Sequence, residues 1–233
     1  MRILIVDQCS ASKDHSDGVD PLELDDIEGS PEEAISSSDL NGIEAADLYT
    51  GKQQRRIDTA VRNLRQKGHE VDRFFVSAGF GLVRETERLP PYNVTFSGMN
   101  NERIRQRGEE LGITDKLVDQ VGKDRYELAF FALGSDYYRA MDIEQVLASV
   151  PKETTVIMFN REEDEEEWGN VLSIPARTEE ARENGSTVIG LKGTYLERFA
   201  SRLDEGSVEI DEEVIRDYCE SSETSQTNFD EYD

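Results

Sequence analysis

The sequence predicts an α/β protein with a mostly parallel sheet and helices on both faces. Short apolar runs alternate with longer segments of helical periodicity, which is typical of parallel strands joined by helical crossovers. The chain of 233 residues is long enough to bury a sizeable core and fits one domain. We therefore expect a single domain over residues 1–219 and a disordered acidic tail at 220–233.

The first expected strand is residues 2–7, a short apolar run. Residues 14–40 are rich in Asp, Glu and Ser and contain few large apolar groups, which predicts a mobile insertion. Thr50 and Gln53 then have the spacing of a capping box, so a helix should follow and end at Gly68. Its predicted buried face consists of Ile57, Ala60, Val61 and Leu64.

Four further strands are expected at residues 71–77, 127–133, 155–159 and 187–191. Helical periodicity covers residues 101–121, with a break near Gly112. Asp142 is expected to cap a short helix. A capping box that begins at Thr194 predicts another helix, and a last helix should span about 212–219.

The composition is strongly acidic. The formal net charge is -25, from 51 Asp and Glu against 26 Lys and Arg. Lysine is scarce and occurs only at positions 13, 52, 67, 116, 123, 152 and 192. Acid-rich, lysine-poor chains are typical of halophile proteins, because hydrated carboxylates keep them soluble while salt screens the repulsion between charges. Most of this acidity therefore predicts a solvated surface.

Targeting and redox signals favour a cytoplasmic protein. No apolar run approaches the roughly 20 residues that a membrane helix needs, and the apolar start is too short for a signal peptide. Cys9 and Cys219 are far apart and do not suggest a disulfide framework, so a reducing compartment is the simplest setting. His15 and His69 are isolated, so neither a metal nor another cofactor is expected.

Small polar residues follow the predicted strands. Ligands of parallel sheets bind beyond the carboxyl ends of the strands, so these segments predict the functional edge of the molecule. They are residues 8–13, 77–81, 134–136 and 192–194. Gly134, which opens the third segment, is a candidate ligand-binding residue.

The segment C-S-A-S-K at residues 9–13 has the composition of a ligand-binding loop. Small residues such as Ser10 let the backbone approach a ligand, exposed amides can hold an anion, and Lys13 supplies a positive charge. Cys9 becomes a nucleophile if Lys13 or the local amides stabilise its thiolate. The alternative is that Cys9 fills the core and Lys13 is a surface charge.

Two tyrosines and a glycine-rich turn extend the candidate site. Tyr49 offers a ring for stacking or a hydroxyl donor, and the alternative is a core tyrosine. The turn after residue 77 contains G-x-G, but arginine replaces the next glycine of a dinucleotide fingerprint. We therefore interpret Gly81 as part of a tight turn that presents Ser77. Pro91 and Tyr92 lie in an extended segment that can form one wall of a pocket.

Basic residues concentrate between residues 52 and 107. This stretch has 12 basic and 6 acidic residues, a net charge of +6, which leaves -31 for the rest of the chain. A local positive face on a very acidic protein suggests a phosphate-bearing partner. The candidate contacts on the expected helix are Arg55, Arg56, Arg62 and Arg65. The alternative is that these arginines pair with the acidic surface.

Four segments together resemble the YaaA-like superfamily. They are C-S-x-S-K after the first strand, A-x-x-L-Y-x-G before a helix, S-A-x-x-G-L-V and P-Y-x-x-T-F, over about residues 1–13 and 43–140. The resemblance implies a uracil-DNA-glycosylase-like α/β fold, association with DNA and a role in limiting its oxidative damage. A more distant similarity to the C-S-x-x-K domain of archaeosine synthases implies a nucleobase or modified nucleotide as ligand. By this resemblance the site residues are Cys9, Ser10, Lys13, Tyr49, Ser77, Gly81, Pro91 and Tyr92.

Three functional hypotheses follow. The first is a YaaA-like nucleic-acid-associated protein in which Lys13, Cys9 and Ser77 are the catalytic candidates and Tyr49 and Tyr92 flank a base. The second is a non-catalytic DNA- or RNA-binding module that uses the arginine-rich helix. The third is a thiol-based stress sensor. The partner expected is nucleic acid, DNA before RNA, or a nucleobase-like small molecule, and no membrane. The sequence leaves open whether the protein is an enzyme, and its oligomeric state.

Overall fold

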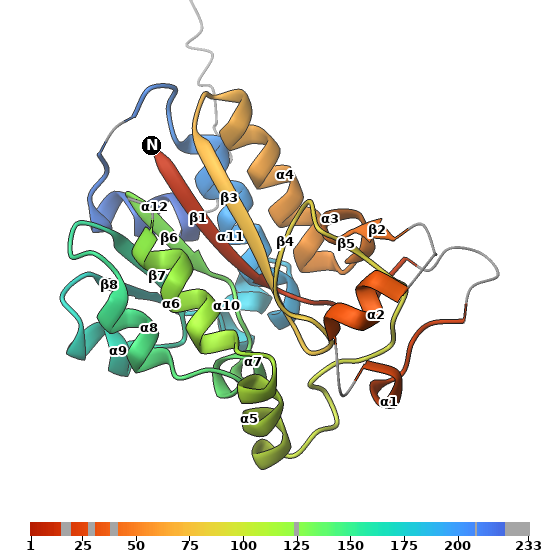
Figure 1. Cartoon of the computed structure of the whole chain (residues 1–233). Coiled ribbons are helices and arrows are strands. Elements are labelled where there is room, and N and C mark those ends of the chain that lie inside the picture. Colours follow the sequence, from red (N-terminus) through yellow and green to blue (C-terminus); the bar gives the residue numbers. More distant parts are fainter. Residues whose placement is uncertain (15–19, 28–30, 38–41, 124–125, 208, 222–233) are drawn as a thin grey trace, which may run out of the picture.

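The computed structural model describes residues 1–14, 20–27, 31–37, 42–123, 126–207 and 209–221. Its main strands are β1 (Arg2–Gln8), β3 (Glu70–Ser77), β4 (Gly81–Arg84), β6 (Leu128–Phe131), β7 (Thr155–Phe159) and β8 (Val171–Ile174). They form one sheet in the order β4-β3-β1-β6-β7-β8 (Figure 1). All neighbours are parallel except β3 and β4. The predicted α/β fold with a mostly parallel sheet is confirmed.

Strand β1 lies where the chain reverses its course across the sheet. It pairs with β3 on one side and with β6 on the other. Helix α4 (Lys52–Gln66) lies between β1 and β3 in the chain, whereas α5 (Asn101–Glu110) and α6 (Ile113–Lys123) lie between β4 and β6. Parallel sheets place a crevice outside the carboxyl ends of the strands at such a reversal. The topology therefore points to the ends of β1 and β6.

The two faces of the sheet are covered by different helices. Ile3 and Ile5 of β1 belong to a core shared with α4, α11 (Val188–Arg202) and α12 (Glu212–Glu220). The alternate residues Leu4 and Val6 belong to a second core shared with α5, α6 and α8 (Ile143–Ser149). This alternation is the period of two of a β-strand. Figure 1 shows α6 in front of the sheet and α11 behind it.

Helix α4 confirms the predicted apolar face, since Ile57, Ala60, Val61 and Leu64 are all buried. It ends before Gly68, whose φ of 80° suits glycine. Its beginning differs from the prediction, because the N-cap is Gly51 and no side-chain cap is formed. Gln53, the expected partner of a capping box, instead turns inward to the sheet.

The strand predicted at residues 187–191 is wrong. Thr187 is the N-cap of α11, and its hydroxyl accepts a hydrogen bond from the Gly190 amide at 3.2 Å. The predicted capping box at Thr194 therefore lies inside a helix that has already begun. α11 packs closely along α4 because Gly193 has no side chain: a Cβ there would lie 2.8 Å from the Gln53 carbonyl oxygen. The fifth parallel strand is β8, and the short helices α9 (Glu162–Glu167) and α10 (Thr178–Glu183) flank it.

Other predicted helices are confirmed. The break near Gly112 separates α5 from α6, and Gly112 has a φ of 61°. Asp142 caps α8 by accepting a hydrogen bond from the Gln145 amide at 3.1 Å. The last helix is α12. No helix in the described part of the chain is long and apolar enough to cross a membrane.

The acidic insertion contains structure that the sequence did not predict. It includes α1 (Leu24–Ile27) and α2 (Pro31–Ser37), and Ile27 is fully buried. The Leu22 amide donates to the Pro91 carbonyl oxygen at 2.9 Å, which attaches the insertion to the rest of the fold. A small pair of strands follows, β2 (Ile43–Glu44) with β5 (Arg88–Leu89), together with α3 (Ala45–Leu48). The rest of the predicted mobile insertion, at 15–19, 28–30 and 38–41, and the predicted tail at 222–233 lie outside the described residues.

Candidate functional site

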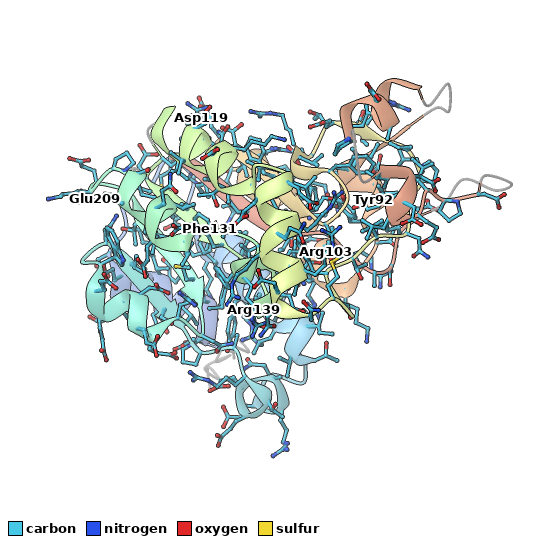
Figure 2. All side chains as sticks on the ribbon, turned by 60° about the horizontal axis from the view of Figure 1, so that its bottom comes forward. Tyr92, Arg103, Asp119, Phe131, Arg139 and Glu209 are labelled. Atoms are coloured by element: carbon cyan, nitrogen blue, oxygen red, sulfur yellow. The ribbon has the colours of Figure 1, made fainter. Side chains whose placement is uncertain are left out.

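The carboxyl ends of the parallel strands meet at one edge of the sheet. Figure 2 turns this edge toward the viewer and labels Phe131, the last residue of β6, and Arg139 of α7 (Ser135–Arg139). The loops after β1 and β6 are tied together: the Gln8 side-chain oxygen accepts a hydrogen bond from the Gly134 amide at 2.7 Å. Gly134 is the N-cap of α7. The predicted convergence of strand ends therefore holds for residues 8–13, 77–81 and 134–136.

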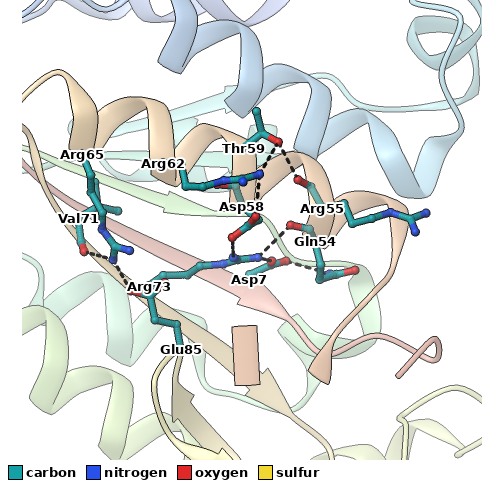
Figure 3. A network of polar contacts seen from close by, with 10 residues as sticks. All are labelled: Asp7, Gln54, Arg55, Asp58, Thr59, Arg62, Arg65, Val71, Arg73 and Glu85. Carbon is teal, nitrogen blue, oxygen red and sulfur yellow. Dashed lines mark hydrogen bonds and ion pairs between the residues drawn. The ribbon is translucent and has the colours of Figure 1, made fainter. Parts of the chain in front are cut away.

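A buried ion pair underlies this edge (Figure 3). Arg73 donates to an Asp7 carboxylate oxygen at 2.9 Å, and both side chains are fully inaccessible to solvent. The other Asp7 oxygen accepts hydrogen bonds from the Gln53 amide at 2.8 Å and the Gln54 amide at 3.2 Å. Gln53 also donates to the Ala132 carbonyl at 2.7 Å, which leaves its own side-chain oxygen without a hydrogen-bond partner among the described residues. The start of α4 is thus attached to the ends of β1 and β6.

Tyr49, Ser77 and Tyr92 form a closed cluster beside this network. The Ser77 hydroxyl oxygen accepts the amides of Gly79 and Phe80 at 3.2 and 3.1 Å, which leaves its hydrogen for the Tyr92 hydroxyl at 2.8 Å. The Tyr92 and Tyr49 hydroxyls are 2.7 Å apart. Burial raises the pKa of both tyrosines, so both stay neutral. All three side chains are buried, and a role in flanking a base stays a prediction.

Lys13 lies against this cluster rather than free in a loop. Its amine donates to the Val94 carbonyl at 3.3 Å and lies 4.5 Å from the centre of the Tyr92 ring. Burial lowers the pKa of the Lys13 amine. The Ser10 hydroxyl accepts the Ser12 amide at 3.0 Å. Because chain contacts already engage these groups, an anion would have to displace them to bind here.

Gly81 shapes the turn after β3, and Pro91 is buried and accepts the Leu22 amide at its carbonyl oxygen at 2.9 Å. Gly81 has a φ of 78°, and a Cβ there would lie 3.0 Å from the Leu111 carbonyl oxygen, so the turn after β3 requires glycine. This agrees with the interpretation of a tight turn. Arg107 holds the same turn, because its guanidinium donates to the carbonyls of Ala78 and Gly79, both at 3.0 Å.

The Cys9 thiol is expected to react with iodoacetamide at least about a hundredfold more slowly in the native protein than in urea, because its reaction requires local opening. Cys9 is 1% exposed, and its sulfur lies 3.2 Å from the Tyr137 hydroxyl. Mass spectrometry after timed pulses gives the rate, and the fully buried Cys219 is the internal reference. Rapid native alkylation of Cys9 alone would instead support the thiol-sensor hypothesis.

Three of the four candidate arginines on α4 are paired with acidic side chains. Arg56 contacts Glu197 at 2.5 Å, Arg62 contacts Asp58 at 3.0 Å, and Arg65 contacts Glu85. The guanidinium of Arg55 has no such partner among the described residues. It lies with Lys52 at a hollow of about 530 Å³ between the first turns of α4 and α11. The alternative interpretation, pairing with the acidic surface, therefore describes three of these arginines.

A second opening, also of about 530 Å³, lies at the carboxyl ends of β6 and β7. We call it the Lys192 cavity. Its lining comes from five parts of the chain that are far apart in sequence, and its charged and polar members include Arg105, Glu109, Ser135, Arg139, Asp142, Asn160, Arg161 and Lys192. Leu133 and Phe159 contribute apolar surface. The cavity thus combines charged donors with an apolar wall, which is the usual composition of a small-molecule site.

Lys192 stands out because it is a mostly buried lysine whose amine has no hydrogen-bond acceptor among the described residues. The residue is 8% exposed, and within the described residues it has no hydrogen bond or ion pair. Burial lowers the pKa of the Lys192 amine to about 8, although the nearby Asp7 carboxylate opposes this shift. A buried lysine with this pKa in a cavity is a functional-site candidate.

Arginines surround the opening. Arg139 is held by Asp136 at 2.6 Å, Arg105 by Glu102 at 3.6 Å, and Arg161 by Asp164. Four cationic side chains and two anionic ones, Glu109 and Asp142, therefore line the Lys192 cavity. The acidic partners offset this charge, so the case for an anionic ligand rests on the guanidinium and amine donors that line the cavity and not on a net positive charge.

The wall next to Arg161 contains a strained residue. Asn160 has a φ of 57°, which is uncommon for a residue other than glycine. Two hydrogen bonds of its side chain stabilise this conformation. The side-chain oxygen accepts the Ala176 amide at 2.7 Å, and the side-chain nitrogen donates to the Ala176 carbonyl at 3.2 Å. Strain of this kind persists where the surroundings fix it and is frequent at functional sites.

Comparison with known proteins gives a family but no activity. A family model described as a family of unknown function, DUF6884, matches residues 36–162, more than half of the chain. The chain belongs to this family. A comparison with curated proteins gave no significant match.

The DUF6884 segment contains most of the cavity but not its lysine. Arg105, Arg139 and Arg161 lie inside the matched residues, whereas Lys192 lies beyond them. The sequence indicates Lys192 only as the first residue after the strand expected at 187–191, and that segment is in fact part of a helix. None of the three arginines was among the predicted site residues. Asn160 and Arg161 directly follow the correctly predicted strand at 155–159, so the rule of strand ends would have found these two residues.

Proposed function

We propose that the protein binds a phosphate-bearing ligand of the nucleotide class, free or within a nucleic acid, in the Lys192 cavity. The observation that carries this proposal is the amine of the mostly buried Lys192, which lines the cavity and lacks an acceptor among the described residues. Its nitrogen is not one of the described polar atoms that are both inaccessible and unpartnered, so it can meet a ligand in the cavity. A phosphate oxygen would supply the acceptor, and the arginines at the opening would add donors.

A nucleotide fits the cavity better than a bare anion does. Its volume of about 530 Å³ is in the range of small-molecule sites. The apolar surfaces of Leu133 and Phe159 suit a base or a sugar beside the charged groups. The resemblance to the YaaA-like superfamily also favours a nucleobase or nucleic acid, with DNA before RNA, and alone supports a role in oxidative stress or in action on a base.

Replacing Lys192 with methionine is expected to weaken ligand binding at least about tenfold, because a charge-assisted hydrogen bond in a buried site is worth about 1.5–3 kcal/mol. Calorimetric titrations with inorganic phosphate, nucleoside monophosphates and a 5′-phosphorylated single strand, in a potassium chloride series, give the affinities. Lys152→Met is the matched control, since Lys152 is exposed and lines neither of the two openings. Equal affinities for wild type and Lys192→Met would exclude this site.

A second candidate function is nucleic-acid binding along α4. It is favoured by the unpaired Arg55 guanidinium beside Lys52 at the second hollow. Arg55→Glu is expected to weaken binding of all nucleic-acid sequences alike and to lower the salt slope by about 1, because each phosphate contact releases about one counterion. Arg62→Glu is the control, since Arg62 already pairs with Asp58. Identical salt slopes for both variants and the wild type would remove the α4 surface as the interface.

A further inference from the structure

The Lys192 amine differs in its surroundings from the amines of the half-buried Lys67 and Lys13. Lys67 donates to three carbonyls, those of Ala200, Ser201 and Leu203, at 2.7–3.0 Å. Lys13 donates to a carbonyl and lies over an aromatic ring. Among the described residues Lys192 alone combines burial, a cavity and the lack of an acceptor. Its nitrogen is therefore accessible to a ligand.

The charges around Lys192 allow a free amine near neutral pH. The Asp7 carboxylate below it favours the ammonium form, but burial outweighs this effect, and the pKa is about 8. The other titratable or charged groups that line the cavity are Arg105, Glu109, Tyr138, Arg139, Asp142 and Arg161. At pH 8 about half of such an amine is unprotonated, compared with less than about 1% of an exposed lysine. A lysine desolvated in this way is a nucleophile.

We infer that Lys192 forms an imine with the aldehyde carbon of a phosphate-bearing sugar, whose phosphate the arginines at the opening bind. This inference rests on the phosphate site of the proposed function, and it replaces the intact nucleotide by a sugar phosphate that carries no base. The amine nitrogen bonds to the aldehyde carbon, the carbonyl oxygen takes both amine hydrogens, and it leaves as water. No oxidant or reductant takes part.

Two kinds of molecule carry both groups, a free sugar phosphate and a sugar that has lost its base within a nucleic acid. In the open-chain form each has an aldehyde and a phosphate on the same sugar. Arg105 of α5 and Arg139 of α7 both line the opening and can contact two phosphates of a strand as well as one of a free sugar. The experiment therefore has one arm for each source.

Reductive trapping tests the inference. The wild-type protein is incubated with ribose 5-phosphate, or with an oligonucleotide that contains one base-free deoxyribose, and sodium cyanoborohydride reduces any imine to a stable amine. We expect one adduct per chain, mapped to Lys192 by peptide mass spectrometry, with a yield that rises between pH 7 and about 8 and then levels. An oligonucleotide with tetrahydrofuran in place of the sugar has no aldehyde and should give no adduct.

Two variants separate this chemistry from simple anion binding. Lys192→Arg keeps the positive charge and should reduce trapping at least tenfold, whereas Lys152→Met, at an exposed lysine that lines neither opening, should leave it unchanged. Adducts spread over exposed lysines or centred on Lys13, or the lack of any adduct on wild-type Lys192, would overturn the inference while leaving phosphate binding in place. If inorganic phosphate does not inhibit trapping at Lys192, the result would support imine formation there and would contradict the proposed phosphate site. Peptide mapping of the wild type decides the case even if Lys192→Arg fails to fold.

Discussion

Replacing Arg73 with leucine is expected to lower the free energy of unfolding by about 3–5 kcal/mol, the largest loss of stability that we predict. Arg73 and Asp7 are both fully buried, with 2.9 Å between the guanidinium nitrogen and the carboxylate oxygen. Leucine would leave the Asp7 carboxylate with only neutral donors, those of Gln53, Gln54 and the Gln8 amide. An uncompensated buried charge accounts for most of the expected loss.

Urea denaturation at constant potassium chloride measures this loss. Arg88→Leu is the control, because Arg88 and Glu44 are both exposed and 4.0 Å apart, and such pairs contribute little. Adding Asp7→Asn to Arg73→Leu should recover part of the stability, since it removes the unpaired charge. If the double variant is no more stable than Arg73→Leu, the loss comes from packing of Arg73, which also lies 4.5 Å from the Phe75 ring.

The fold was predictable where local pattern and tertiary environment agree. The strand at 155–159 and the buried face of α4 fall where the sequence predicts them. The prediction failed at 187–191, where β-branched residues favour a strand. In the structure Val188 and Ile189 are 42% and 70% exposed, so their apolar character does not reflect burial in a sheet. The helix forms there because Thr187 caps it and Gly193 lets it approach α4.

The site was predictable only in part, because its members come from distant parts of the chain. The rule of strand ends pointed to the edge of the sheet where the Lys192 cavity lies, and it included Ser135, which lines that cavity. The positions of Arg105 and Lys192 follow from how α5 and α11 pack, and no local pattern contains that information. The candidates Tyr49, Ser77 and Tyr92 were predicted to lie together, and they do, but in a closed cluster. Spacing along the chain does not distinguish an open site from a closed one.

Replacing Gly108 with alanine is expected to lower the free energy of unfolding by about 2–3 kcal/mol and to weaken ligand binding as well. A Cβ at Gly108 would lie 1.8 Å from the Ala140 carbonyl oxygen, so α5 would have to move away from the chain at the end of α7. Overpacking against backbone is costly because neither side can relax by a change of rotamer. The displaced segments carry Arg105 and Arg139, which both line the Lys192 cavity.

Gly122→Ala in α6 is the matched control for the same change of residue in a helix. The nearest atom to a Cβ at Gly122 is the Ser149 carbonyl oxygen at 3.9 Å, an ordinary contact. Because alanine favours the helix over glycine, this variant should be neutral or more stable by up to about 1 kcal/mol. Urea denaturation gives both stabilities, and phosphate titration gives both affinities. A Gly108→Ala protein with wild-type stability would show that α5 and α7 are not in close contact in solution. Lost stability with unchanged phosphate affinity would separate this helix contact from the Lys192 cavity.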